Sequence, residues 1–143
     1  MYPEEVVKPM RQEAVAMGFQ ELRTAAEVND ALSKKSGTAL VFVNSICGCA
    51  AGMARPGIGL ALKKAEAKPD NLYTVFAGND AEATKTARGY FHGYPPSSPS
   101  MALLKDGKIQ TMIQRLDIEG HSADQVADQL LDAFMTYCGD TSA

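Results

Sequence analysis

Residues 38–52, TALVFVNSICGCAAG, join an apolar, β-rich run to two cysteines that are separated by one glycine. The run from Thr38 to Val43 is nearly continuously apolar, which is typical of a central strand covered on both faces. Cys47 and Cys49 follow directly, at the start of a predicted helix. Because chemistry in α/β sheets gathers at the carboxyl ends of strands, this stretch predicts both the centre of a sheet and a site at its edge.

The rest of the chain alternates between helical and strand patterns around this stretch. Capping boxes at Thr24/Glu27 and Ser122/Gln125 mark two helix starts, and Asp106-Gly107 is a strong hairpin signal. The sequence thus predicts the α/β class, with a mixed sheet, helices on both faces, an additional N-terminal helix and a single domain over residues 1–143. The apolar spacing predicts helices at about 4–17, 25–35, 49–67 (interrupted by Pro56), 81–90 and 123–138, and strands at about 19–22, 38–43, 72–76, 101–104 and 109–116.

Composition and charge exclude several classes of function. The 143 residues carry a net charge of −3, with scattered lysines and arginines, which argues against nucleic acid or an anionic membrane as partner. Three cysteines do not match the disulfide framework of a small secreted protein. The acidic start, residues 1–5, lacks the features of a signal peptide, and no run approaches the about 18 apolar residues of a membrane span. We therefore expect a cytoplasmic protein, and nothing in the sequence sets an oligomeric state.

The position of Cys47 at a helix start favours a thiolate. Unpaired backbone N–H groups and the positive end of the helix dipole lie there, and both stabilise the charged form of sulfur. Cys47 is therefore the candidate nucleophile. A disulfide to Cys49 would close a small, strained ring that is easily reduced, and Gly48 would give the backbone the freedom to close it.

Four separated segments resemble the bacilliredoxins, a bacterial thioredoxin-like family with a Cys-Gly-Cys site: residues 43–56, 74–78, 96–105 and 118–121. The similarity runs along nearly the whole chain. It implies a thioredoxin-like fold and a thiol–disulfide oxidoreductase that removes bacillithiol from mixed disulfides on proteins, with a weaker disulfide isomerase activity. A low-molecular-weight thiol such as bacillithiol would be the co-substrate, with no bound cofactor.

The resemblance also assigns roles to residues. Cys47 would attack and Cys49 would resolve, and Pro99 matches the cis-proline that opens a strand in thioredoxins. The strained ring of a Cys-Gly-Cys disulfide favours isomerisation or mixed-disulfide exchange over thioredoxin-like reduction of clients.

Polar residues near these positions are candidates for supporting roles. Asn44 and Ser45 end the central strand, where they either donate hydrogen bonds to the thiolate or cap the turn. Ser98, next to Pro99, would present backbone groups to an extended substrate segment. Glu119 is a candidate proton acceptor for the resolving thiol, or else a solvated loop residue. Arg55 is expected to pair with a carboxylate or to face water.

Two other functions would use the same cysteines. A zinc or copper(I) site could be completed by Cys138 or a histidine, but structural zinc sites use four ligands with Cys-X₂₋₄-Cys spacing, so no metal site is predicted. A redox sensor without turnover would oxidise its cysteine pair and exchange no mixed disulfides. Cys138 itself lies on an apolar helix face, where we expect it to pack, with a second resolving thiol as the alternative.

Overall fold

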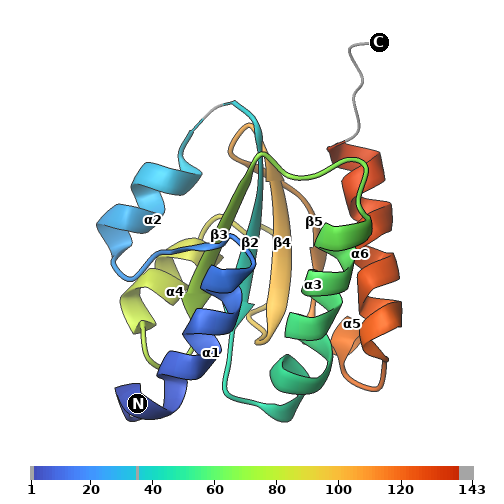
Figure 1. Cartoon of the computed structure of the whole chain (residues 1–143). Helices are drawn as coiled ribbons and strands as arrows, with labels where there is room; N and C mark the ends of the chain where they lie inside the picture. Colours follow the sequence, from blue (N-terminus) through green and yellow to red (C-terminus); the bar gives the residue numbers. More distant parts are fainter. Residues whose placement is uncertain (1, 35, 139–143) are drawn as a thin grey trace.

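Figure 1 shows the fold as a computed structural model, which describes residues 2–34 and 36–138. The strands are β1 (Gln20–Glu21), β2 (Thr38–Asn44), β3 (Asn71–Phe76), β4 (Ser100–Lys105) and β5 (Lys108–Ile113). The helices are α1 (Glu4–Ala16), α2 (Ala25–Leu32), the π-helical segment η1 (Ala50–Ala54), α3 (Arg55–Lys64), α4 (Ala81–Arg88), α5 (Arg115–Ile118) and α6 (Ala123–Tyr137).

The strands of the described residues form one mixed sheet in the order β1-β3-β2-β4-β5. β2 lies at its centre, parallel to β3 and antiparallel to β4. Every residue of β2 except Ala39 is buried, which confirms the central strand that the apolar run predicts. The carboxyl end of β2 leads directly into the turn that carries the cysteines.

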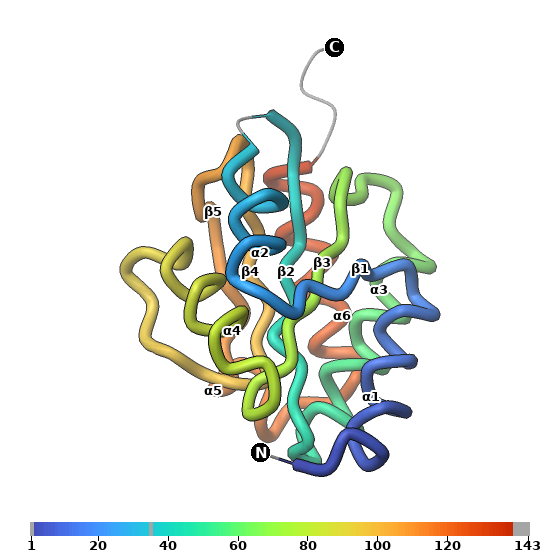
Figure 2. Tube along the Cα trace, turned by 90° about the vertical axis from the view of Figure 1, so that its left-hand side faces the viewer, coloured from blue at the N-terminus to red at the C-terminus, as the bar shows by residue number. Residues whose placement is uncertain are grey.

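Helices cover both faces of the sheet, with α1, α3 and α6 on one face and α2 and α4 on the other (Figures 1 and 2). Because side chains alternate along a strand, Leu40 and Phe42 join the first core cluster and Val41 and Val43 the second. The predicted mixed sheet and the additional N-terminal helix are confirmed. Within the part of the chain that the structure describes, no helix is both long and apolar enough to cross a membrane.

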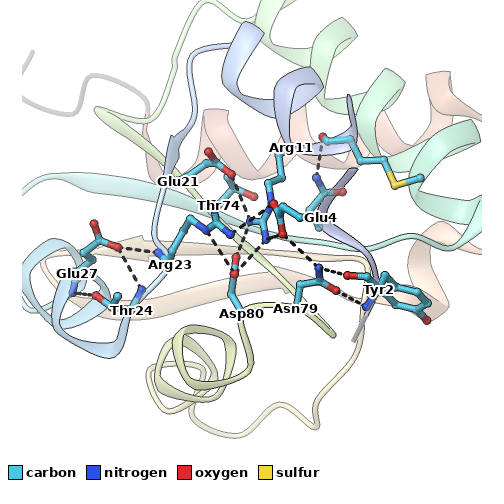
Figure 3. A network of polar contacts seen from close by, with 12 residues as sticks. Tyr2, Glu4, Arg11, Glu21, Arg23, Thr24, Glu27, Thr74, Asn79 and Asp80 are labelled. Atoms are coloured by element: carbon cyan, nitrogen blue, oxygen red, sulfur yellow. Dashed lines mark hydrogen bonds and ion pairs between the residues drawn. The ribbon is translucent and has the colours of Figure 1, made fainter. Parts of the chain in front are cut away.

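A buried arginine ties α1 to the loop after β3. Arg11 is 5% exposed, and its Nη1 lies 2.6 Å from Oδ2 of Asp80, which is itself buried (Figure 3). Glu4 and Glu21 add ion pairs at 2.6 and 3.3 Å, and the guanidinium lies 5.2 Å from the centroid of the Phe76 ring. This cluster fixes the helix against the carboxyl end of β3.

The local signals of the sequence are largely confirmed. Thr24 and Ser122 each accept a hydrogen bond from the backbone N–H three residues later, and both predicted capping boxes are complete. Asp106 and Gly107 have φ values of 54° and 81°, as the tight turn between β4 and β5 requires.

The helix after the cysteines differs in form from the prediction. It begins at Gly48, but its next turns are π-helical, with the Arg55 N–H donating to the Ala50 carbonyl five residues earlier. Pro56 follows, lacks an N–H, and would crowd the carbonyl four residues before it in a regular helix. The widened turn gives room for the proline ring. The predicted interruption at Pro56 is therefore present as a π-helical segment.

The predicted strand of residues 109–116 is wrong beyond Ile113. Gln114 caps a short helix, α5, through a capping box with Asp117, and the Gln114 N–H donates to Oδ2 of Asp117 at 3.0 Å. This local polar bonding ends the strand that the apolar residues alone would continue. It also turns Arg115 and Glu119 toward the cysteines.

Candidate active site

The turn after β2 places Cys47 at the start of the helix, as predicted. The Ser45 N–H donates to Oδ1 of Asn44 at 2.9 Å, and the Cys47 N–H donates to Oγ of Ser45 at 3.1 Å. The Cys47 carbonyl accepts hydrogen bonds from the N–H groups of Ala50 and Ala51 at 3.0 and 3.4 Å. Cys47 thus stands at the N-terminus of the helix with its side chain half-buried.

Hydrogen bonds make the Cys47 thiol more acidic than an ordinary cysteine. Burial opposes ionisation, but hydrogen bonds from the Ser45 hydroxyl, from the backbone N–H groups of Ala50 and Cys49, and from the Cys49 thiol outweigh it and lower the pKa of Cys47. These donors stabilise the thiolate because hydrogen bonding to a charged form favours that form. The lowered pKa agrees with the acidity that the helix start predicts.

The Cys49 thiol, in contrast, is less acidic than an ordinary cysteine. Burial, its hydrogen bond to Cys47 and the negative charge of that sulfur raise the pKa of Cys49. The nearby charge of Arg115 lowers it, whereas that of Glu119 raises it further. Of the two thiols, Cys47 is therefore the one that loses its proton first, which is the order that an attacking and a resolving thiol require.

The Pro99 loop lies beside this turn. Ser100 is opposite Val43 in the β4–β2 ladder, so the start of β4 and the end of β2 are neighbours. The Ser98–Pro99 peptide bond is cis, as the resemblance implies. The Ser98 carbonyl accepts a hydrogen bond from Nη1 of Arg115 at 3.2 Å, so this backbone group is already bonded within the chain.

Arg115 and Glu119 form a charged pair beside the two thiols. Nε of Arg115 lies 3.2 Å from Oε2 of Glu119, and both side chains are nearly half exposed. Pairing with Glu119 and the charge of Cys47 raise the pKa of Arg115. Glu119 is thus close enough to influence Cys49, as its predicted role requires. Arg115 was missed in the sequence because it fell within a predicted strand, although its spacing from Glu119 is that of a helical ion pair.

Asn44 holds the turn and does not donate to the thiolate. Its Nδ2 donates to the Met10 carbonyl at 3.1 Å, while its Oδ1 accepts from Ser45 and from Arg55. Of the two roles considered for these residues, Asn44 has only that of holding the turn, whereas Ser45 has both, because its Oγ accepts from the Cys47 N–H and its hydroxyl lowers the pKa of Cys47. Arg55 pairs with a carboxylate as predicted, with Nε 3.1 Å from Oε2 of Glu13.

Gly48 leaves open space in front of the cysteines. It lies in the first helical turn, its φ is not positive, and apart from its neighbours Cys47 and Cys49 and the backbone of its own helix no heavy atom lies within 4 Å of the place where a Cβ would stand. The reduced site therefore does not use the conformational freedom of glycine. The position of the missing side chain instead faces open space between the two cysteines.

Cys138 lies at the other end of the sheet. Burial raises the pKa of its thiol, and the groups that influence it are Thr38, Asp70 and Lys105. Thr38 begins β2 and Cys47 follows its end, so about 20 Å of strand separates the two regions. Cys138 packs against the first core cluster, which confirms the packing role. Among residues 2–34 and 36–138, no group of three or more histidine, cysteine, aspartate or glutamate side chains is arranged to hold a metal ion.

Comparisons with known proteins agree with this geometry. The family described as "Disulphide isomerase" matches residues 2–138. The chain is 55% identical to a bacilliredoxin of Geobacillus kaustophilus, over 96% of this chain and 95% of the relative. It is 54% identical to a bacilliredoxin of Koribacter versatilis, over 99% and 97% of the two chains.

Solved structures confirm the thioredoxin-like fold. A mutant thioredoxin from Halobacterium salinarum superposes with a TM-score of 0.57 at 17% identity, covering 85% of this chain and 92% of the thioredoxin. A thioredoxin from Fasciola hepatica gives a TM-score of 0.57 at 18% identity, covering 83% and 99% of the two chains.

Proposed function

The chain belongs to the bacilliredoxin family, and from this premise we propose that it is a thiol–disulfide oxidoreductase that exchanges mixed disulfides between protein cysteines and a low-molecular-weight thiol. The observation that carries the proposal is the opposite acidity of two neighbouring thiols. The pKa of Cys47 is lowered and that of Cys49 is raised, at a helix start beside a cis-proline loop.

The first step uses the thiolate of Cys47. It attacks the small-thiol sulfur of a mixed disulfide, an S–S bond forms between Cys47 and the small thiol, and the sulfur of the client protein leaves as a thiolate. Cys47 is half-buried and not sealed in the core, and a side chain at Gly48 would face open space, so we expect the mixed disulfide to reach Cys47 from this side. The client is then reduced, and the small thiol remains on the enzyme.

The second step removes the small thiol from Cys47. Cys49 loses its proton and attacks the Cys47 sulfur, which forms the Cys47–Cys49 disulfide and releases the small thiol as a thiolate. We assign Glu119 as the proton acceptor, because the raised pKa of Cys49 makes such an acceptor necessary and Glu119 is close enough to influence it. A second small thiol can instead attack the small-thiol sulfur and regenerate the Cys47 thiolate directly.

Protein clients are proposed to dock along the Pro99 loop. Ser98 would present its backbone to an extended client segment, as an added strand. Its carbonyl is shared with Arg115, so the client would use the second lone pair of that oxygen or displace the guanidinium.

We propose bacillithiol as the small thiol and the cytoplasm as the compartment. The proposal of bacillithiol is based on the family, and that of the cytoplasm on the cysteine count, because three cysteines do not match the disulfide framework of a small secreted protein. The strained ring also favours a weaker isomerase activity, because a Cys47–Cys49 disulfide that is easily reduced corresponds to a dithiol that is a poor reductant, so the pair rearranges client disulfides instead of reducing them.

Mass spectrometry of two variants tests the proposal. Cys49→Ala and Cys47→Ala are each incubated with a protein carrying a bacillithiol mixed disulfide, and a glutathione mixed disulfide serves as the comparison thiol. The adduct should accumulate on Cys47 in Cys49→Ala and be absent from Cys47→Ala. An adduct that persists in Cys47→Ala would reverse the roles, and oxidation of the pair without any exchange would favour a redox sensor.

The potential of the pair provides a second test. A strained Cys47–Cys49 disulfide should have a reduction potential above the about −270 mV of thioredoxin. Equilibration with defined ratios of reduced and oxidised glutathione measures it. A potential at or below that of thioredoxin would contradict the proposed preference for exchange and isomerisation.

A further inference from the structure

Arg55 is a buried charge that the proposed reaction does not use. It is 4% exposed and lies on the helix after the cysteines, yet its guanidinium reaches back to the turn before them. Nη1 donates to Oδ1 of Asn44 at 2.9 Å and to the Ser45 carbonyl at 3.2 Å. A buried cation is costly unless it is paired and hydrogen-bonded, so these contacts are the reason it can be held there.

Helix α1 supports this contact from two sides. The Met10 carbonyl accepts a hydrogen bond from Nδ2 of Asn44 at 3.1 Å, and Oε2 of Glu13 lies 3.1 Å from Nε of Arg55. The second pair is electrostatic, because Nε makes no aligned hydrogen bond. The additional N-terminal helix therefore reaches the turn through Asn44 and balances the charge of Arg55.

The contacts converge on Ser45. Its N–H is held by Asn44 and its carbonyl by Arg55, so both of its peptide groups are fixed. Its Oγ accepts from the Cys47 N–H at 3.1 Å, which leaves the hydroxyl proton to be donated to the Cys47 sulfur. A small rotation of this turn would remove the donor from the thiolate.

We propose that Arg55 is a positioning residue, which holds Ser45 so that its hydroxyl stays aimed at the sulfur of Cys47. The inference rests on the proposed function in one respect, that Cys47 is the attacking thiol. It does not rest on the identity of the small thiol or of the clients.

The pH dependence of alkylation tests this role. Wild-type, Arg55→Met and Arg55→Lys proteins are reduced and treated with iodoacetamide from acidic to alkaline pH, with the modified cysteine assigned by mass spectrometry. Arg55→Met should move the midpoint for Cys47 upward, and each unit of movement slows alkylation below the midpoint by about tenfold. The Cys47 midpoint of Arg55→Lys should lie between those of wild type and Arg55→Met, because an ammonium keeps the charge but loses the planar guanidinium that faces the turn through Nη1 and Glu13 through Nε.

Arg11→Met is the matched control. Arg11 is 5% exposed, and its side-chain hydrogen bonds and ion pairs go to Glu4, Glu21 and Asp80 instead of to Ser45 or the cysteines. The Arg11→Met substitution should lower the thermal stability of the protein and leave the Cys47 midpoint at its wild-type value. The proposal is overturned if Arg55→Met leaves the midpoint unchanged, or if Arg11→Met moves it equally. Should Arg55→Met not fold, the Arg55→Lys midpoint decides alone, and an unshifted value overturns the proposal.

Alkylation, combined with the mixed-disulfide exchange experiment, separates this inference from the proposed function. Alkylation requires no mixed disulfide, so a failure of the proposed function appears as a wild-type protein with a low Cys47 midpoint and no exchange. A failure of the positioning role appears as Cys47 midpoints in the Arg55 variants that equal the wild-type midpoint, whether or not the proteins exchange mixed disulfides.

Discussion

At the scale of single residues, the central feature is the division of acidity between two thiols that lie two positions apart. The helix start predicts a lowered pKa for Cys47, and the structure agrees. The contribution of Ser45 could not be assigned from the sequence, because the aim of its hydroxyl depends on Asn44 and on Arg55, which is ten residues away. The raised pKa of Cys49 likewise depends on which sulfur donates the hydrogen bond.

Replacing Ser45 by alanine should raise the pKa of Cys47. A hydrogen bond to a charged group contributes about 1.5–3 kcal/mol, which corresponds to roughly one to two pKa units. Alkylation rates of Cys47 from about pH 5 to about pH 10.5, a range that extends well above the about 8.5 of an ordinary thiol, measure the change. Ser33→Ala, which removes an exposed hydroxyl on the far side of the sheet, should leave the profile unchanged. An unchanged pH profile in Ser45→Ala would show that the Ser45 hydroxyl does not lower the pKa of Cys47.

The stability of the reduced protein should depend on pH through Cys47. Because its pKa is lowered by folding, the folded state holds a thiolate at pH values where the unfolded chain still binds the proton. Its contribution is complete above the unfolded pKa of about 8.5 and is lost as pH falls through the folded value. Urea unfolding of Cys49→Ser, which isolates Cys47, should therefore show stability rising with pH relative to Cys47→Ala/Cys49→Ser. Parallel curves for the two proteins would contradict the lowered pKa.

At the scale of elements, apolar spacing and capping boxes predicted the central strand and most helices, because these signals are local. They did not predict η1, because its widened turn forms to accommodate the ring of Pro56. They also did not predict α5, because its start depends on a capping box that begins with glutamine. The contact between α3 and α6 was also not predictable, since it depends on which helix face meets a neighbour more than 60 residues away. A Cβ at Gly57 would stand 2.7 Å from Cγ1 of Val126 and 3.1 Å from the Ala123 carbonyl.

Gly57→Ala should therefore destabilise the protein. Overpacking typically costs about 1–3 kcal/mol and here opposes the about 1 kcal/mol by which alanine favours a helix. Gly59→Ala is the matched control on the same helix, because its Cβ would meet only Sδ of Met17 at 3.5 Å. Denaturant unfolding should show a loss for Gly57→Ala and no loss for Gly59→Ala. Equal stabilities would mean that α3 and α6 are less closely packed than described.

At the scale of the whole molecule, α1 is joined to the sheet by polar contacts over long sequence distances. The hydrogen bond from Arg11 to Asp80 spans 69 positions, and α1 also meets the cysteine turn through Asn44 and Arg55. Apolar spacing predicted that this helix exists, but it cannot show which charges the helix buries. The predicted fold class follows from alternating β and α patterns, whereas the ion pairs require the folded arrangement.

Arg11→Met should cost about 3–5 kcal/mol of unfolding free energy, because it leaves the buried Asp80 without its main partner. Arg23→Met is the matched control. Arg23 also approaches Asp80, at 3.5 Å, but its side chain is 47% exposed, so its loss should cost at most about 1 kcal/mol. Thermal and urea unfolding of both variants measure the difference. Similar losses would show that burial does not set the strength of this cluster.

The reaction of the three thiols with iodoacetamide at neutral pH tests the central claim most directly. In the reduced wild-type protein, the adduct should form first on Cys47, with a pH midpoint below the about 8.5 of an ordinary thiol, while Cys49 and Cys138 react later. First modification of Cys49 or Cys138, or a Cys47 midpoint at the ordinary value, would contradict the account.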